Sequence, residues 1–196
     1  MTSTRQPIAD QPLDARREQI KCAALKVFSE QGIGGTKMSL IAAEAGISQG
    51  LSYRYFKSKE EIFTLLVEEA LEAAQASIDR LPDLPGTPTE QIRAFTANML
   101  DESHKKYFLL LRQAQTSEEV PDRVKQLLER YSAKDTLGGL VPILVRGQQA
   151  GEFGPGDPER LLFLYFSVVT GLMLQDIHVP EGYWLQEIDR LMKLLG

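Results

Sequence analysis

Three observations predict that this chain is an all-α protein. Apolar residues recur at three- and four-residue spacings in one segment after another, which is the period of an amphipathic helix. Good helix starts precede several of these segments, as in Ser58-Lys59-Glu60-Glu61 and Asp157-Pro158. Strand signals are scarce throughout. The chain has 196 residues, 43% of them hydrophobic, which is enough for one large or two small domains with a real core.

The N-terminal residues 1–13 lack the apolar core of a signal peptide, and we expect them to form a disordered arm. No run approaches the roughly 18 apolar residues of a membrane span, so we expect a cytoplasmic protein without a membrane partner. The single cysteine, Cys22, excludes an intramolecular disulfide, and we expect it to be buried or half-buried. His104 and His178 lie far apart without metal-ligand spacing, so neither a metal nor a cofactor is expected.

The first helix is predicted from about Asp14, a plausible cap, to Gly32. Its single apolar stripe comprises Ile20, Ala23, Ala24, Val27 and Phe28. Arg17 lies in the first turn, where the helix dipole disfavours a cation. Two interpretations of Arg17 stay open: a contact with a phosphate, or membership of a solvated charged face.

Two short helices separated by Gly46 follow between Thr36 and Lys59, and this pattern predicts a helix-turn-helix. Ser48 is placed to cap the second of these helices. That helix offers hydrogen-bonding groups and flat aromatic rings without an acidic residue, a surface suited to the phosphates and base edges of DNA. Its residues of this kind are Ser48, Gln49, Ser52, Tyr53, Arg54 and Tyr55. Thr36, Lys37 and Ser39 lie at the start of the first short helix, where free backbone N–H groups can meet a phosphate.

Two residues of this region are unexpected in a helix. Gly50, near the start of the second short helix, costs about 1 kcal/mol relative to alanine. Either it lets the backbone approach DNA closely, or it packs against the first helix. Lys59 is a cation in the acidic first turn of a long helix that we expect to run from Ser58 to about Arg80. A nearby phosphate explains such a cation better than the helix dipole, which opposes it.

The net charge of −5 is unevenly distributed along the chain. Residues 1–60 contain nine Lys or Arg against six Asp or Glu, a balance of +3, whereas residues 61–196 contain thirteen against twenty-one, a balance of −8. A basic N-terminal part on an acidic body concentrates the attraction for phosphate at one end of the molecule.

Residues 14–65 resemble the N-terminal DNA-binding domain of the TetR/AcrR family of bacterial transcriptional regulators. The resemblance rests on twenty-one positions: Arg17, Ile20, Ala23, Ala24, Phe28, Glu30, Gly32, Thr36, Ile41, Ala42, Ala45, Gly46, Ile47, Ser48, Gly50, Tyr53, Tyr55, Phe56, Ser58, Lys59 and Glu60. It implies an all-helical homodimer whose recognition helices enter successive major grooves of a double-stranded DNA operator. It also implies a C-terminal domain, here 59–196, that binds an effector and dimerises, after a DNA-binding domain at 14–58.

The same resemblance implies which residues meet DNA. The matching positions are Thr36, Ser48, Gln49, Gly50, Tyr53, Arg54, Tyr55 and Lys59. Position 55 is often histidine in this family and position 54 is variable, so no base preference follows for Tyr55 or Arg54.

The C-terminal body is predicted to be helical from its own pattern. Thr87, Pro88 and Glu90 form a good helix start after a proline-rich turn. A further helix is expected over Lys105–Gln115, and another opens at Pro121 and is divided near Gly138 and Pro142 before Gly151. The last two helices are expected from Asp157 and from Gly182 to Leu195.

The helix after Asp157 is apolar nearly all round, so it must be covered on several sides. A partner subunit, contacting this helix and the last one across a twofold axis, explains that coverage most simply. Deep burial within one subunit is the alternative. The expected dimer interface comprises Leu161, Leu164, Tyr165, Val168, Leu172, Trp184, Ile188 and Leu191.

An effector site is expected in the body, where apolar bulk is mixed with a few polar tips. The candidate residues are Phe95, Met99, Phe108, Gln113, Phe166 and Met173, although each taken alone is more often a core residue. No phosphate loop, nucleophile elbow or His/Cys cluster indicates an enzyme. The sequence therefore predicts a dimeric repressor that a small molecule releases from a palindromic operator. An architectural DNA-binding protein without an effector is the alternative.

Overall fold

The computed structural model describes residues 13–131, 138–175 and 182–196. Throughout these ranges the regular secondary structure is helical. The elements are α1 (Leu13–Gly35), α2 (Met38–Glu44), α3 (Gln49–Tyr55), α4 (Lys59–Arg80), η1 (Leu81–Asp83), α5 (Pro88–Met99), α6 (Glu102–Thr116), α7 (Asp122–Arg130), α9 (Val141–Gln149), α10 (Pro158–Met173), α11 (Tyr183–Met192) and η2 (Lys193–Leu195). The all-α prediction is therefore confirmed, while the predictions on the 1–12 part of the arm and on His178 fall outside the described residues.

Helix starts are formed by the caps that the sequence predicts. The Ser48 hydroxyl accepts a hydrogen bond from Leu51 N, and the Asp157 carboxylate accepts one from Arg160 N. Thr87 and Glu90 complete a reciprocal capping box. At α4 only half of the predicted box forms. Ser58 accepts from Glu61 N at 3.2 Å, but the Glu61 carboxylate accepts from Lys57 N at 2.7 Å instead of from Ser58 N.

The chain forms two compact units, residues 1–66 and 67–196. The first unit ends at Leu66 and not at the predicted boundary after Ser58, because the first turns of α4 supply part of its core. Ile62 and Leu66 are buried, and Phe63 meets Phe28 edge-to-face with ring centroids 5.0 Å apart. The helix α4 therefore belongs to both units: it begins in the first and continues into the second.

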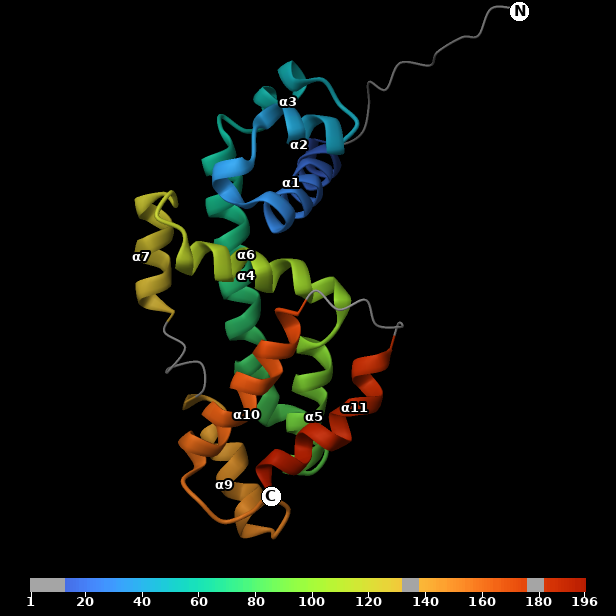
Figure 1. Ribbon diagram of the computed structural model, residues 1–196, viewed down its shortest axis with the longest axis vertical. Coiled ribbons are helices and arrows are strands. Elements are labelled where there is room, and N and C mark those ends of the chain that lie inside the picture. The colour runs from blue at the N-terminus through green and yellow to red at the C-terminus, as the bar shows by residue number, and fades with distance from the viewer. Residues whose placement is uncertain (1–12, 132–137, 176–181) are drawn as a thin grey trace, which may run out of the picture. The chain divides into compact units, whose positions relative to one another are not determined.

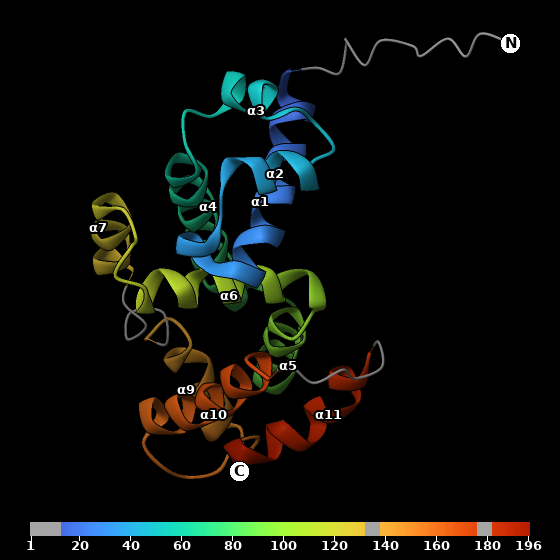
Figure 2. The same ribbon diagram turned by 45° about the horizontal axis from the view of Figure 1, so that its top comes forward.

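The core of the first unit lies between α1, the α2–α3 pair and the start of α4 (Figure 2). Ile20, Ala24, Phe28 and Ile41 are all fully buried, as the apolar pattern predicts. Near its end α1 is interrupted at Gly32, whose φ of 71° is left-handed and favours glycine. The expectation for Cys22 is wrong, because this residue is exposed.

The second unit is built on α5, α9, α10 and α11, which gather around one core (Figure 1). The helices α9 and α11 both pack against α5, and α10 packs against α9 and η2. Tyr165 lies at the centre of this core with its hydroxyl 2.8 Å from that of Thr96, which in turn donates to the Ile92 carbonyl. Burial raises the pKa of Tyr165.

Candidate nucleic-acid interface and ligand cavity

The helix α3 presents one polar face to solvent and one apolar edge to the core. Ser48, Gln49, Gly50 and Arg54 are exposed, and Tyr53 is 50% exposed. Tyr55 is half-buried. On the inner side Ser52 is fully buried with its hydroxyl donating to the Gln49 carbonyl, and Phe56 fills the core as predicted. The exposed face therefore offers amide, guanidinium, hydroxyl and aromatic groups, but no carboxylate, from a single short helix.

Gly50 is surrounded by open space. A Cβ atom built on it would have no other atom within 4 Å, and the residue is exposed. The interpretation that Gly50 packs against the first helix is therefore wrong. The other interpretation, that Gly50 lets the backbone approach DNA closely, stays a prediction.

Three of the predicted phosphate contacts, Thr36, Arg17 and Lys59, have hydrogen-bond partners within the chain. Thr36 is fully buried, and its hydroxyl donates to the Gly32 carbonyl at 2.6 Å, so it closes the end of α1 instead of facing outward. Lys37 and Ser39 are exposed, as an outward role requires.

Arg17 makes an intramolecular contact that neither of its two interpretations foresees. Its guanidinium carbon lies 4.3 Å from the centroid of the Phe56 ring, in cation–π geometry. Its Nη1 atom also donates to the Tyr55 carbonyl at 3.2 Å. Arg17 therefore ties α1 to the end of α3 and fixes the helix that carries the exposed polar face.

Lys59 is a second internal tie. Its ammonium donates to the Ile33 carbonyl at 2.7 Å and to the Thr36 carbonyl at 2.9 Å. The Ile33 carbonyl lies in the last turn of α1, after the interruption at Gly32, and the Thr36 carbonyl lies between α1 and α2. The cation in the acidic first turn of α4 is therefore explained without a phosphate, which corrects the prediction. We call Lys59 with these two carbonyls the lysine clamp.

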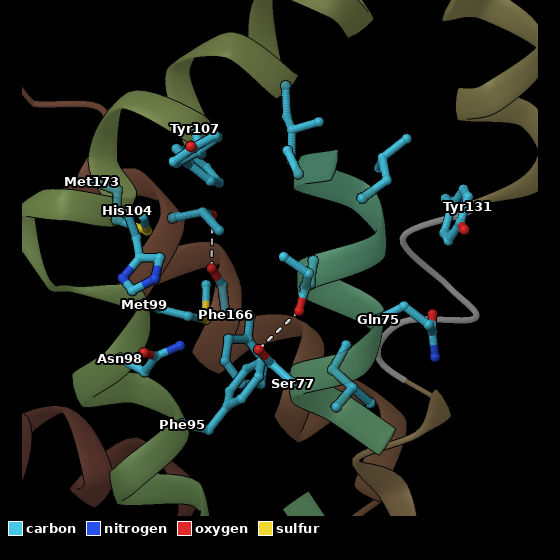
Figure 3. Close-up of a pocket in the computed structure, with 18 of the residues that line it drawn as sticks. Gln75, Ser77, Phe95, Asn98, Met99, His104, Tyr107, Tyr131, Phe166 and Met173 are labelled. Atoms are coloured by element: carbon cyan, nitrogen blue, oxygen red, sulfur yellow. Dashed lines mark hydrogen bonds between the residues drawn. The ribbon is translucent and has the colours of Figure 1, made fainter. Parts of the chain in front are cut away.

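The second unit encloses a cavity of about 640 Å³ between α4, α5, α6 and α10 (Figure 3). Most of its walls are aromatic or aliphatic. Five of the six residues predicted to bind an effector line it: Phe95, Met99, Phe108, Phe166 and Met173. Gln113 does not line it. The lining residues of α6 include His104 and Phe108, and at 3.6 residues per turn Gln113 lies on the opposite side of the helix from His104.

The wall that α4 supplies was missed by the sequence prediction. Leu71, Ala74, Ser77 and Ile78 of α4 all line the cavity. The apolar pattern of the helix was recognised, but nothing in the pattern separates a residue that faces a cavity from one that faces a packed core.

The hydroxyl groups in the cavity wall donate to their own helices. Ser77 donates to the Ala73 carbonyl at 2.9 Å, Ser167 to the Phe163 carbonyl at 2.7 Å, and Thr170 to the Phe166 carbonyl at 2.7 Å. Each oxygen is left with lone pairs toward its surroundings, while its hydrogen is engaged. These three hydroxyls are therefore hydrogen-bond acceptors in the wall.

The helix α10 has a third face besides those toward the core and the cavity. Leu164 and Val168 are 56% and 37% exposed, and Leu161 and Leu172 are half-buried. A Cβ on the neighbouring Gly171 would meet no atom within 4 Å. We call Leu161, Leu164, Val168 and Leu172 the outer stripe of α10.

Four of the residues assigned to a dimer interface are occupied within the chain. Tyr165 and Ile188 are fully buried in the core of the second unit, and Trp184 and Leu191 pack against the same core. Tyr165 and Ile188 are therefore core residues and not interface residues. The other four residues predicted for the interface, Leu161, Leu164, Val168 and Leu172, make up the outer stripe.

A helix-turn-helix with an exposed polar second helix, joined to a helical unit with its own cavity, defines the class of helix-turn-helix transcriptional regulators. A family model described as bacterial regulatory proteins, tetR family, matches residues 22–66. The regulator HbdR of Aromatoleum sp. is 37% identical over 91 residues, which is 46% of this chain and 40% of that protein. The repressor NicS of Pseudomonas putida is 27% identical over 155 residues, 78% of this chain and 73% of that protein.

A solved structure, that of the ketosteroid transcriptional regulator KstR2 of Mycobacterium tuberculosis, superposes with a TM-score of 0.75 over 97% of both chains at 23% identity, a likeness that shows the fold. Residues 22–66 of this chain therefore match the DNA-binding part of the tetR family of bacterial regulatory proteins. These relatives are regulators and not enzymes. Among the described residues, no group of three or more His, Cys, Asp or Glu is arranged to hold a metal ion, and none of the helices there has the length and apolarity to cross a membrane.

Proposed function

We propose that this protein is a homodimeric repressor that acts in the cytoplasm, binds a palindromic operator and is released by a small-molecule effector. The observation that carries the proposal is the exposed face of α3, where Gln49, Gly50, Tyr53 and Arg54 gather without a carboxylate. Such groups suit both the phosphates and the base edges of a major groove. Ser48, Lys37, Ser39 and Tyr55 extend the proposed contact surface.

The symmetry of the proposed complex follows from the geometry of DNA. Two copies of α3 about 34–36 Å apart would enter successive major grooves on one side of the duplex and would select a palindrome. The outer stripe of α10 is the proposed contact between the two subunits, since its leucine and valine side chains are exposed in the single chain.

Repression and release are proposed from two further features. The relative NicS carries the name of a repressor. The cavity of about 640 Å³ falls within the usual range for small-molecule sites. The helix α4 carries the lysine clamp at its start and lines the cavity from Glu69 to Ile78. An effector that binds better to a state with altered spacing of the two α3 helices would shift the population away from DNA.

The test uses a duplex selected from a random pool by the wild-type protein, with affinity measured by fluorescence anisotropy. Tyr53→Ala should weaken binding by at least about fivefold, because a lost base or phosphate contact is worth roughly 1–3 kcal/mol. Tyr183→Ala is the matched control, since it removes an exposed tyrosine from the second unit. Equal affinities for Tyr53→Ala and wild type would remove α3 from the proposed interface. Retention on DNA in the presence of every molecule that fills the cavity would favour the architectural alternative.

A further inference from the structure

The walls of the cavity in the second unit carry an unusual balance of charge. None of the lining residues that the structure describes is a lysine or an arginine, whereas Glu69 contributes a carboxylate. Phe95, Phe108 and Phe166 exemplify the rest of the wall, which is mainly aromatic and aliphatic. A buried anion needs a cation or several donors, because burial otherwise costs it much of its hydration.

Three hydroxyl groups of the wall do not supply such donors. The hydrogens of Ser77, Ser167 and Thr170 are all engaged by carbonyls of their own helices. At these hydroxyls an anion would meet oxygen lone pairs, and Glu69 adds a carboxylate to the wall. The other hydroxyl and amide donors of the wall belong to side chains without a formal positive charge to balance that of an anion: Tyr107, Tyr131, Gln75, Asn98 and Gln115. A ligand with a hydroxyl or an N–H group, by contrast, can donate to the three hydroxyl oxygens.

One wall of the cavity carries polar side chains that can bind an uncharged polar group of a ligand. Figure 3 shows Asn98 and His104 on this wall, close to Met99. Both polar residues are exposed, so they lie where water reaches the cavity. His104 Nδ1 is 3.8 Å from an Asp101 oxygen, so a carboxylate already lies beside the imidazole. A carboxamide and an imidazole can each hold the carbonyl or hydroxyl of a ligand whose apolar body fills the interior.

We infer that this cavity accepts uncharged, mostly apolar molecules with a hydrogen-bonding oxygen or nitrogen at one end, and that it rejects anions of the same skeleton. The inference rests on the proposed effector function and specifies the chemical class of the effector. It excludes free fatty acids and other carboxylates as ligands, and favours alcohols, ketones and neutral amines of similar size.

The test compares two fluorescent probes that differ only in one charged group. N-phenyl-1-naphthylamine is neutral, and 1-anilinonaphthalene-8-sulfonate is the same skeleton with a sulfonate. In titrations of the full chain at neutral pH, the neutral probe should saturate at about one per subunit, with a Kd at least tenfold lower than that of the sulfonate. Displacement of the neutral probe provides a second measurement without a variant: 1-dodecanol should displace it, and dodecanoate should not.

Variants assign the probe to the cavity. Ala74→Trp fills the interior from α4 and should abolish binding of the neutral probe while circular dichroism stays unchanged. Ser167→Lys adds a cation to the exposed edge of the wall and should tighten sulfonate binding at least tenfold. Ala94→Lys adds the same charge at an exposed position outside the lining and should leave sulfonate binding unchanged.

The outcomes separate the two proposals. If the sulfonate binds as tightly as the neutral probe and Ala74→Trp removes both, or if dodecanoate displaces as well as dodecanol does, the rejection of anions is refuted while an effector cavity remains. If neither probe binds and neither aliphatic molecule alters the affinity for DNA, both the inference and the effector function are refuted.

Discussion

Removal of the Lys59 ammonium tests whether this residue is an internal clamp or a phosphate contact. Lys59→Met keeps the apolar stem and deletes the donor to the Ile33 and Thr36 carbonyls. A hydrogen bond with a charged donor contributes about 1.5–3 kcal/mol. The Lys59 side chain is 24% exposed, so water partly replaces the lost donor. At the lower end of this range the two bonds together contribute about 3 kcal/mol, and partial exposure reduces that value. We therefore expect the α1–α2 connection to lose about 2–3 kcal/mol of local stability.

The expected loss is local, so hydrogen exchange of the DNA-free protein is the suitable assay. A loss of 2–3 kcal/mol corresponds to amide exchange that is roughly 30- to 150-fold faster around residues 33–41. Lys57→Met is the matched control, because Lys57 is exposed and contacts Glu61 through its backbone N–H. If Lys59→Met leaves this exchange unchanged and only weakens DNA binding, the clamp is refuted and the phosphate contact is restored.

Three further predictions use the same structure. Gly50→Leu should leave the melting temperature within a few degrees of wild type, because the space around Gly50 is open, yet weaken operator binding at least tenfold. Leu164→Glu should give monomers by light scattering with unchanged circular dichroism, and a dimeric variant would count against the outer stripe. The Thr89 N–H lowers the pKa of Glu152 from its ordinary value, so the stability from this contact is complete at neutral pH and is lost as the pH falls through the lowered pKa. Glu152→Gln should therefore show a smaller fall in urea midpoint than wild type between about pH 5 and 3.

The helices and their starts could be predicted because their signals are local. Ser48, Thr87 and Asp157 each cap a helix by bonding to a backbone N–H three residues on. The second half of the box at α4 failed because the Glu61 carboxylate accepts from Lys57 N, one residue before the predicted donor Ser58 N. Such competition between neighbouring donors is decided by backbone angles that the sequence pattern does not show.

The roles of Arg17 and Lys59 could not be predicted because their partners are distant backbone carbonyls. Arg17 bonds a carbonyl 38 positions away, and Lys59 bonds one 26 positions away. Every residue has a carbonyl, so no residue type marks the acceptor. A cation in an unfavourable helix position correctly indicated a nearby negative partial charge. For Lys59 the prediction assigned that charge to DNA, whereas the structure supplies it from within the chain.

The assignment of faces on α10 has a similar limit, and it changes what the dimer proposal rests on. A helix that is apolar all round requires cover on several sides, but two of those sides are occupied within one subunit, by the core and by the cavity. The outer stripe remains to be covered. Leu161, Leu164 and Val168 follow one another at intervals of three and four residues, which is the spacing that packs one helix against a second copy of itself. The next step of three reaches Gly171, where open space lets another helix approach closely. The proposed dimer thus depends on this narrow stripe and not on the overall apolarity of the helix, which is why a single charge at Leu164 suffices to test it.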